Sequence, residues 1–253
     1  MDAEKIKAHF DSPAVVAQYA QAAVDVGLWR SEEKILTRLF KPEDSLLELG
    51  CGAGRIAIGL HELGYHNVLA TDYSRAMVER ARHLAKMLEY AIPIHVCDAT
   101  DLEFEAGVFD GAIFGFNGLM QIPGRCGREQ ALKEIHRVLR PGAWFVLTTH
   151  DRERSPHQAY WAAEKARWQS GTQNAELEVF GDRAEALESG LHFMHVPTQG
   201  EMIELFERAG FRVEVSVMRS ELAHEPAAVE AFADDCRFWV LQTLRPPKPG
   251  RHH

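Results

Sequence analysis

The chain of 253 residues has no excess of positive charge and no long apolar run. Lys and Arg number 28 against 37 Asp and Glu, which gives a formal net charge of -9 at pH 7. A nucleic-acid surface usually needs clustered Lys and Arg, so this balance argues against a nucleic-acid partner. A membrane-spanning helix needs about 20 consecutive apolar residues, and no run approaches that length. We therefore expect no membrane partner.

The chain also lacks the features of a secreted or metal-binding protein. It has four cysteines, and no two of them form a Cys-x-x-Cys pair. The first ten residues, MDAEKIKAHF, are charged and lack the apolar core of a signal peptide. These features predict a cytoplasmic protein with free thiols. His192 and His195 lie in a segment that looks extended, which would separate the two imidazoles, so we predict no metal site.

The composition that is present is that of a globular domain, with 46% hydrophobic and 26% charged residues. A chain of this length suits one domain with an elaboration. In its middle part, strand-like and helix-like patterns alternate. Such alternation is typical of a mostly parallel sheet with helices on both faces. We therefore predict an α/β fold.

The pattern places the individual elements approximately. The predicted strands are 45–49, 67–71, 94–97, 109–114, 143–149, 211–217 and 238–244, with a further one around 177–180. Helices are expected over 56–63, 128–139 and 156–168. Three more helices should begin at N-caps, at Ser31, at Ser74 and at the capping box of Thr198. Pro141-Gly142 is expected to end the helix over 128–139.

The first predicted strand runs directly into three closely spaced glycines, Gly50, Gly52 and Gly54, before a helix begins. A strand, a glycine loop and a helix in this order let a ligand come close to free backbone N–H groups. Asp72 ends the next strand, where its carboxylate can accept from the two ribose hydroxyls of an adenosine group. A dinucleotide motif needs a third glycine three residues after the second. Arg55 occupies that position, which argues against NAD.

The segment Glu48-x-Gly50-x-Gly52-x-Gly54 resembles motif I of the class I S-adenosylmethionine-dependent methyltransferases. Other segments resemble later motifs of that family in the same order, namely 72–74 with Met77, 97–100, 109–114, 139–143 and 209–211. The resemblance covers about residues 31–245 apart from an insertion. It implies a doubly wound Rossmann-like sheet, mostly parallel with an antiparallel final strand and with helices on both faces.

The resemblance implies that the cofactor is S-adenosyl-L-methionine and the product S-adenosyl-L-homocysteine. Glu48 would face the ammonium group or support the loop, Arg55 would pair with the carboxylate, and Asp98 would accept from the adenine amine. The expected cofactor-binding residues are Tyr19, Trp29, Glu48, Gly50, Cys51, Gly52, Arg55, Asp72, Tyr73, Met77, Asp98, Ala99, Thr100 and Phe114.

The acceptor of the methyl group is expected beyond the carboxyl ends of the fourth and fifth strands. There, Asn117 would hydrogen-bond the acceptor and His150 would take up a proton as the catalytic residues. Residues 151–197 break the alternating pattern and are too long for a simple connection. We interpret them as an insertion that covers the acceptor site, with His192 and His195 lining it.

The remaining parts complete the predicted organisation. Residues 1–30 are expected to form a helical lid, 31–245 the methyltransferase domain, and 246–253 a disordered tail. The leading hypothesis is in-line methyl transfer to the N, O or S atom of a small-molecule acceptor. An RNA-modifying methyltransferase and a non-catalytic regulator that binds the cofactor are the alternatives. The oligomeric state stays open, with a homodimer among the options.

Overall fold

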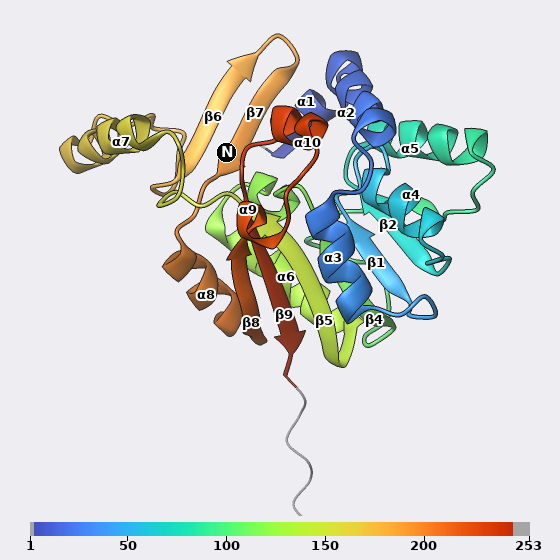
Figure 1. Ribbon diagram of the computed structural model, residues 1–253. Coiled ribbons are helices and arrows are strands. Elements are labelled where there is room, and N and C mark those ends of the chain that lie inside the picture. The colour runs from blue at the N-terminus through green and yellow to red at the C-terminus, as the bar shows by residue number, and fades with distance from the viewer. Residues whose placement is uncertain (1–2, 245–253) are drawn as a thin grey trace, which may run out of the picture.

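The computed structural model of the chain describes residues 3–244. At its centre is a seven-stranded sheet with the order β3-β2-β1-β4-β5-β9-β8 (Figure 1). The strands are β1 (Leu46–Leu49), β2 (Val68–Asp72), β3 (Ile94–Val96), β4 (Phe109–Phe114), β5 (Leu139–Thr149), β8 (Phe211–Met218) and β9 (Arg237–Thr243). Strands β1 to β5 pair in parallel, whereas β9 runs antiparallel to both β5 and β8. The predicted mostly parallel sheet with an antiparallel final strand is confirmed.

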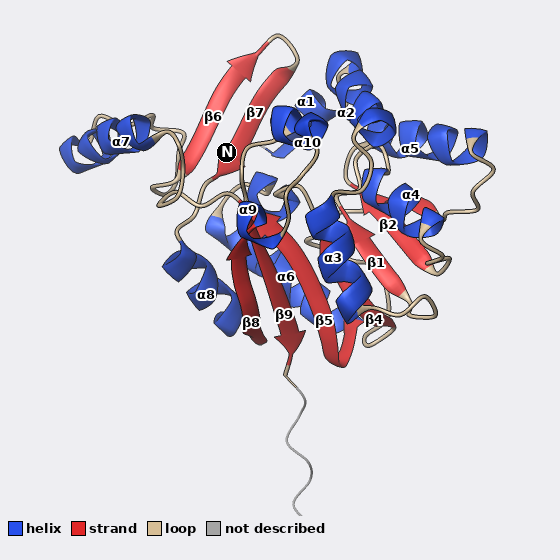
Figure 2. Cartoon of the chain, viewed as in Figure 1, coloured by secondary structure: helices blue, strands red, loops and turns tan. Residues whose placement is uncertain are grey.

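Helices cover both faces of this sheet, as Figure 2 shows. One face carries α3 (Arg30–Leu39), α4 (Arg55–Glu62) and α5 (Arg75–Met87), and the other carries α6 (Arg125–Val138) and α8 (Gln199–Arg208). Strand β1 shows why both faces are needed. Leu47 and Leu49 pack into one core and Leu46 into the other, because successive side chains point to opposite faces. Such a strand is apolar at nearly every position, as the sequence indicated.

Local capping chemistry sets where several helices begin. Ser74 caps α5 by accepting a hydrogen bond from the Met77 N–H, and Thr198 begins α8 with a capping box, as predicted. The predicted N-cap at Ser31 is wrong, since α3 begins at Arg30 and its N-cap is Trp29. The Glu32 carboxylate accepts from the Trp29 N–H at 2.9 Å, which moves the start of the helix.

Two predictions of secondary structure are wrong because contacts with other parts of the chain determine the local structure. Helix α6 ends at Val138, and Pro141-Gly142 lies inside β5 instead of ending the helix. Strand β5 begins at Leu139 because this residue already pairs with Phe109 of β4. The strand predicted at 177–180 is also absent from the described chain. The N–H groups of Glu178 and Val179 instead donate to the Asp182 carboxylate, which makes a turn there.

The insertion over 151–197 has its own small architecture. Helix α7 (Gln158–Ser170) confirms the helix predicted at 156–168, and a two-stranded hairpin follows, β6 (Asp182–Leu187) with β7 (Gly190–His195). The sequence did not predict this hairpin. The division of the chain into lid, domain and insertion stays a prediction, and the disordered tail predicted over 246–253 lies outside the described residues.

The amino end of the chain forms two helices, α1 (Ala3–Phe10) and α2 (Pro13–Asp25). Helix α1 packs against β7, and α2 packs against α4 and α5 (Figure 1). Three short helical segments complete the fold: η1 (Gly118–Gln121) after β4, and α9 (Arg219–Leu222) and α10 (Ala227–Phe232) between β8 and β9.

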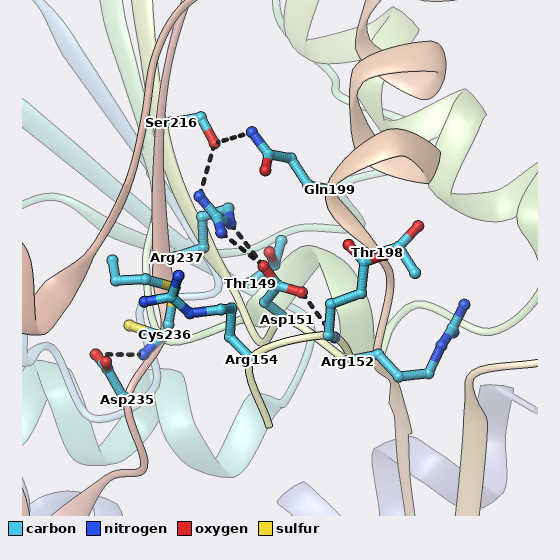
Figure 3. A network of polar contacts seen from close by, with 12 residues as sticks. Thr149, Asp151, Arg152, Arg154, Thr198, Gln199, Ser216, Asp235, Cys236 and Arg237 are labelled. Atoms are coloured by element: carbon cyan, nitrogen blue, oxygen red, sulfur yellow. Dashed lines mark hydrogen bonds and ion pairs between the residues drawn. The ribbon is translucent and has the colours of Figure 1, made fainter. Parts of the chain in front are cut away.

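Buried polar contacts fasten the start of the insertion to the sheet (Figure 3). Asp151 accepts from Nε and Nη2 of Arg237 at 2.9 and 2.7 Å. Arg237 also donates to Ser216 Oγ at 3.1 Å, so β9, β8 and the insertion share one network. Arg152 donates to the Val196 carbonyl at 2.8 Å and pairs with Glu201 at 2.9 Å. These contacts join both ends of the insertion to the body of the protein.

Candidate ligand-binding site

A cavity of about 350 Å³ lies at the carboxyl ends of the parallel strands. It is bounded by the glycine loop after β1, by the end of β2, by the segment after β3 and by the end of β4. All but one of the residues expected to bind the cofactor line it. They are Tyr19, Glu48, Gly50, Cys51, Gly52, Arg55, Asp72, Tyr73, Met77, Asp98, Ala99, Thr100 and Phe114.

The glycine loop needs glycine for two reasons, backbone conformation and space. Gly50, Gly52 and Gly54 have φ values of 58°, 55° and 90°, in the left-handed region that other residues avoid. A Cβ on Gly50 would lie 2.6 Å from Cε2 of Phe114, and one on Gly52 would lie 3.0 Å from Cδ1 of Tyr19. Helix α4 begins at Arg55 directly after the loop, so its first N–H groups lie beside the cavity.

Asp72 is fixed by backbone hydrogen bonds from the loop and from its own turn. Its Oδ2 accepts from the Gly52 N–H and its Oδ1 from the Ser74 N–H, both at 2.8 Å. Burial raises the pKa of Asp72 to about 6, and nearby Asp11 adds to the rise, while the two backbone hydrogen bonds oppose it. The result is an oriented carboxylate at the cavity wall, placed to accept from hydroxyl groups.

Glu48 is buried, with 1% of its surface exposed, and it also lines the cavity. Within residues 3–244, its Oε2 has no hydrogen-bond partner. Burial raises the pKa of Glu48 to about 8, although Arg55 acts in the opposite direction. An unsatisfied buried acceptor costs about 1–3 kcal/mol. A ligand with an N–H donor would remove that cost, so the residues present fit a cofactor that carries an ammonium group.

Asp98 occupies the third strand end, in a tight turn. Its Oδ1 accepts from both the N–H and the Oγ1 of Thr100, each at 2.8 Å. This turn presents Ala99 and the carboxylate of Asp98 to the cavity. The arrangement can accept a hydrogen bond from an amine at the far end of a bound adenosine.

Arg55 and Trp29 require corrections. The guanidinium of Arg55, expected to pair with the cofactor carboxylate, forms two hydrogen bonds of 2.6 Å with Glu32 instead and donates to the Gly27 carbonyl at 2.9 Å. Trp29, with 1% of its surface exposed, is the expected residue that does not line the cavity of the described chain. The guanidinium groups of Arg55 and Arg219 both pack on its ring, 4.6 and 4.9 Å from the ring centroid.

The two candidate catalytic residues contact each other. Nδ2 of Asn117 lies 3.2 Å from Nε2 of His150. Burial lowers the pKa of His150, so its ring is neutral at pH 7 and Nε2 can accept this bond. Within the described chain neither residue lines the cavity, although Phe116 and Gly118, on either side of Asn117, do. The structure thus brings the pair together just behind the cavity wall.

None of the described residues 151–197 lines this cavity, so His192 and His195 do not border it, and their role in an acceptor site stays a prediction. Nδ1 of His195 lies 2.8 Å from Oδ1 of Asp182, in a buried pair. His192 packs against the ring of His9, with ring centroids 5.2 Å apart. The residues 3–244 contain no group of three or more His, Cys, Asp or Glu side chains that could hold a metal ion.

Several cavity residues were not predicted from the sequence. Helix α1 contributes Ala3, Ile6, Lys7 and Phe10, η1 ends at Gln121, and a further lining residue is Phe232. The apolar spacing of Ile6 and Phe10 on a helix was the available signal. Phe232 could not have been found this way, because it reaches the cavity by stacking on Phe116 at 5.1 Å from a separate short helix.

Comparisons with known proteins agree with this geometry. Residues 46–142 match a family model described as a methyltransferase domain. A 2-phytyl-1,4-naphtoquinone methyltransferase of Synechococcus elongatus is 30% identical over 161 residues, covering 60% of this chain and 66% of that protein. The ubiquinone/menaquinone biosynthesis C-methyltransferase UbiE of Geotalea daltonii is 29% identical over 150 residues, covering 57% and 62%. The chain thus spans slightly less than two thirds of the length of these relatives.

Solved structures show the same fold. A methyltransferase of Methanosarcina mazei described as SAM-dependent superposes with a TM-score of 0.67 at 19% identity, covering 87% of this chain and 100% of that one. These matches support the class I S-adenosylmethionine-dependent methyltransferase family, which the ordered motifs predicted. No helix within residues 3–244 is long and apolar enough to cross a membrane.

Proposed function

We propose that this chain binds S-adenosyl-L-methionine in the cavity and transfers its methyl group to a small-molecule acceptor. The observation that carries the proposal is the set of three carboxylates around one glycine loop. Asp72 is placed to accept from the ribose hydroxyls, Asp98 from the adenine amine, and Glu48 from the ammonium group. The family and the fold both imply this cofactor.

When bound, the cofactor supplies an electrophilic methyl group on a sulfonium. The task of the protein residues is to orient the two reactants in line and to exclude water. Helices α1 and α2 close one side of the cavity with Phe10 and Tyr19, while Phe116 and Phe232 close another. Burial raises the pKa of Tyr19 to about 12, so its hydroxyl stays protonated and acts as a neutral hydrogen-bonding group.

We propose an apolar, ring-containing acceptor. The part of the wall beyond the cofactor motifs is mainly apolar, with Ile6, Phe10, Phe116, Ile122 and Phe232. Two of the named relatives act, according to their names, on a naphthoquinone and in quinone biosynthesis. Since one of these is a C-methyltransferase, carbon joins nitrogen, oxygen and sulfur as a candidate acceptor atom.

Asn117 and His150 remain proposed catalytic residues. Oδ1 of Asn117 is buried without a hydrogen-bond partner among residues 3–244, so it could accept from a donor group on an acceptor once this loop shifts toward the cavity. The neutral ring of His150 can take up a proton at Nε2 after a small shift of this loop releases the contact with Asn117. We also propose a cytoplasmic location. Because all of these site residues come from one chain, the proposed mechanism is the same for a monomer and for a homodimer.

The proposal is tested by titration calorimetry with S-adenosyl-L-homocysteine, followed by transfer of a labelled methyl group to a panel of reduced naphthoquinones and benzoquinones. We expect binding with one site per chain and label in at least one quinol. His150→Ala should slow transfer by about tenfold or more and leave cofactor affinity within about twofold. Absence of binding heat with S-adenosyl-L-homocysteine would contradict the proposed function. Transfer of the label to tRNA instead of a quinol would show that the acceptor is RNA.

A further inference from the structure

Helix α1 lines the outer side of the cavity, and polar contacts hold it to the residues that follow Asp72. Ile6 and Phe10 face the cavity. Glu4 accepts from the Tyr73 hydroxyl at 2.8 Å, and Asp11, just after α1, accepts from Ser74 Oγ at 2.6 Å. Tyr73 and Ser74 directly follow Asp72, so α1 is attached beside the proposed ribose site on this side.

The opposite side of α1 rests on the β6–β7 hairpin of the insertion (Figure 1). Nδ1 of His9 lies 2.9 Å from Ser189 Oγ at the hairpin turn. At Gly190, a Cβ would lie 2.9 Å from the backbone N and 3.0 Å from the Cα of His9. The His192 ring packs on the His9 ring. The hairpin therefore touches the backbone of α1 directly, and only glycine permits that approach.

These contacts give the insertion a role that does not need contact with the ligand. None of the described residues 151–197 lines the cavity, yet their hairpin supports the helix that closes it. We propose that Gly190 and His192 are positioning residues that hold α1 closed over the cavity and thereby set the affinity for the cofactor. This inference rests on the proposed function for the identity of the ligand, but the closure itself is a property of the chain.

The histidine pair makes this closure sensitive to pH. Burial and the neighbouring His192 lower the pKa of His9. Burial and Arg183 lower the pKa of His192, while Glu185, its cross-strand neighbour, opposes the change. When α1 is released, both rings regain ordinary pKa values near 6.5, so release takes up protons. Closure is therefore fully favoured above about pH 6.5 and is lost as the pH falls below that value.

The first test compares two glycine substitutions within the insertion. Gly190→Ala pushes the hairpin off His9, whereas Gly171→Ala also places alanine at a positive φ, of 69°, but among the described residues meets no heavy atom within 4 Å. By calorimetry at pH 7.5, we expect Gly190→Ala to weaken S-adenosyl-L-homocysteine binding about fivefold or more, and Gly171→Ala to change it less than about twofold. Thermal unfolding followed by circular dichroism confirms that both variants are folded.

The second test isolates the histidines from the other groups that titrate. Cofactor affinity of the wild type should fall between pH 7.5 and 5.5, partly because Asp72, whose pKa is about 6, takes up a proton. The double variant His9→Gln, His192→Gln keeps the contributions of Asp72 and of Glu48, whose pKa is about 8, so its fall should be clearly smaller than that of the wild type. Identical pH profiles, or wild-type affinity in Gly190→Ala, would overturn the proposal.

A third measurement does not depend on the ligand. Amide hydrogen exchange of residues 3–10 should be slow at pH 7.5 in the wild type and, after correction for the intrinsic pH dependence of exchange, clearly faster in Gly190→Ala and at pH 5.5. If the wild type binds no cofactor but shows this change in exchange, the proposed function fails and the closure stands. If exchange is unchanged while the cofactor binds normally, the closure fails and the proposed function stands.

Discussion

The buried carboxylates in the insertion and those around the cavity differ in whether they form ion pairs. In the insertion and at its base, each buried acid has a cation or imidazole beside it, as in Asp151 with Arg237 and Asp182 with His195. The His195 pairing lowers the pKa of Asp182 although burial alone would raise it. Around the cavity, Glu48 and Asp72 have raised pKa values and form no ion pair within residues 3–244, although the charge of Arg55 acts on Glu48.

The difference separates a scaffold from a binding site. When a buried carboxylate is paired with a cation of the same chain, the pair stabilises its ionised form. Its oxygens are then already hydrogen-bonded and have little capacity to bind a ligand. A buried carboxylate that faces a cavity without a pairing cation is destabilised until a donor arrives, which is the usual state of a functional group. By this criterion we propose Asp72 and Glu48 as ligand contacts, whereas the guanidinium of Arg55 is already paired with Glu32.

The largest expected effect comes from breaking a pair in the scaffold. Arg237→Met leaves Asp151 buried without its partner, so we expect the free energy of unfolding to fall by about 3–5 kcal/mol. Denaturant unfolding measures this. The control is Arg212→Met on neighbouring β8, whose exposed pair with Glu214 should contribute less than about 1 kcal/mol. Equal losses of unfolding free energy in the two variants would contradict the difference between buried and exposed pairs. The cofactor affinity of folded Arg237→Met should stay within about twofold of the wild type.

A smaller effect, on affinity instead of stability, is expected at the cavity. Asp72→Ala removes the acceptor for the ribose hydroxyls and releases the N–H groups of Gly52 and Ser74. Affinity for S-adenosyl-L-homocysteine should fall by about 1.5–3 kcal/mol, measured by calorimetry. The matched control, Asp110→Ala, removes the acceptor of the Ser45 N–H at the end of β4 away from the cavity, and should leave the affinity of the folded protein nearly unchanged. Unchanged affinity in Asp72→Ala would show that the ribose is held elsewhere.

The smallest effect concerns the pH dependence of stability. The folded protein keeps a proton on Glu48 up to about pH 8, whereas the unfolded chain loses it near the ordinary pKa of 4.5. Because only the unfolded state ionises between these values, the free energy of unfolding decreases as the pH rises. Glu48→Gln removes this loss. Between pH 6 and 7.5, the stability of the variant relative to the wild type should grow by up to about 2 kcal/mol. A constant difference across this range would mean that Glu48 is ionised in the folded state.

Local sequence patterns were sufficient to predict the carboxylates and glycines that line the cavity. Asp72 and Asp98 follow short apolar strands, and the three glycines follow another, so the topology of a parallel sheet brings them to one edge without further information. The same reasoning could not detect that Arg55 is paired, because its partner Glu32 lies 23 residues earlier and meets it only after α3 packs. Tertiary contacts, instead of residue type, decided the role of that side chain.

The insertion was harder to predict for a related reason. The strand β6 has the sequence DRAEAL, which has few of the β-branched and aromatic residues that favour strands. Its hairpin is stabilised by pairing with β7 and by contact with α1, as in the bond between His9 and Ser189, which are 180 residues apart. A local window of sequence contains β7 but not α1, so the contact between the hairpin and α1 could be found only from the three-dimensional structure.

The position of β9 has a consequence for how the chain folds as it is synthesised. Strand β8 has no partner in the seven-stranded sheet other than β9, and β9 fills the space between β8 and β5. A nascent chain that has emerged only as far as β8 therefore carries two open strand edges, on β5 and on β8, with Phe211 lacking its neighbours across β9. Contacts so far apart in sequence form slowly. We expect this interval to be the one in which the growing chain most depends on protection from aggregation.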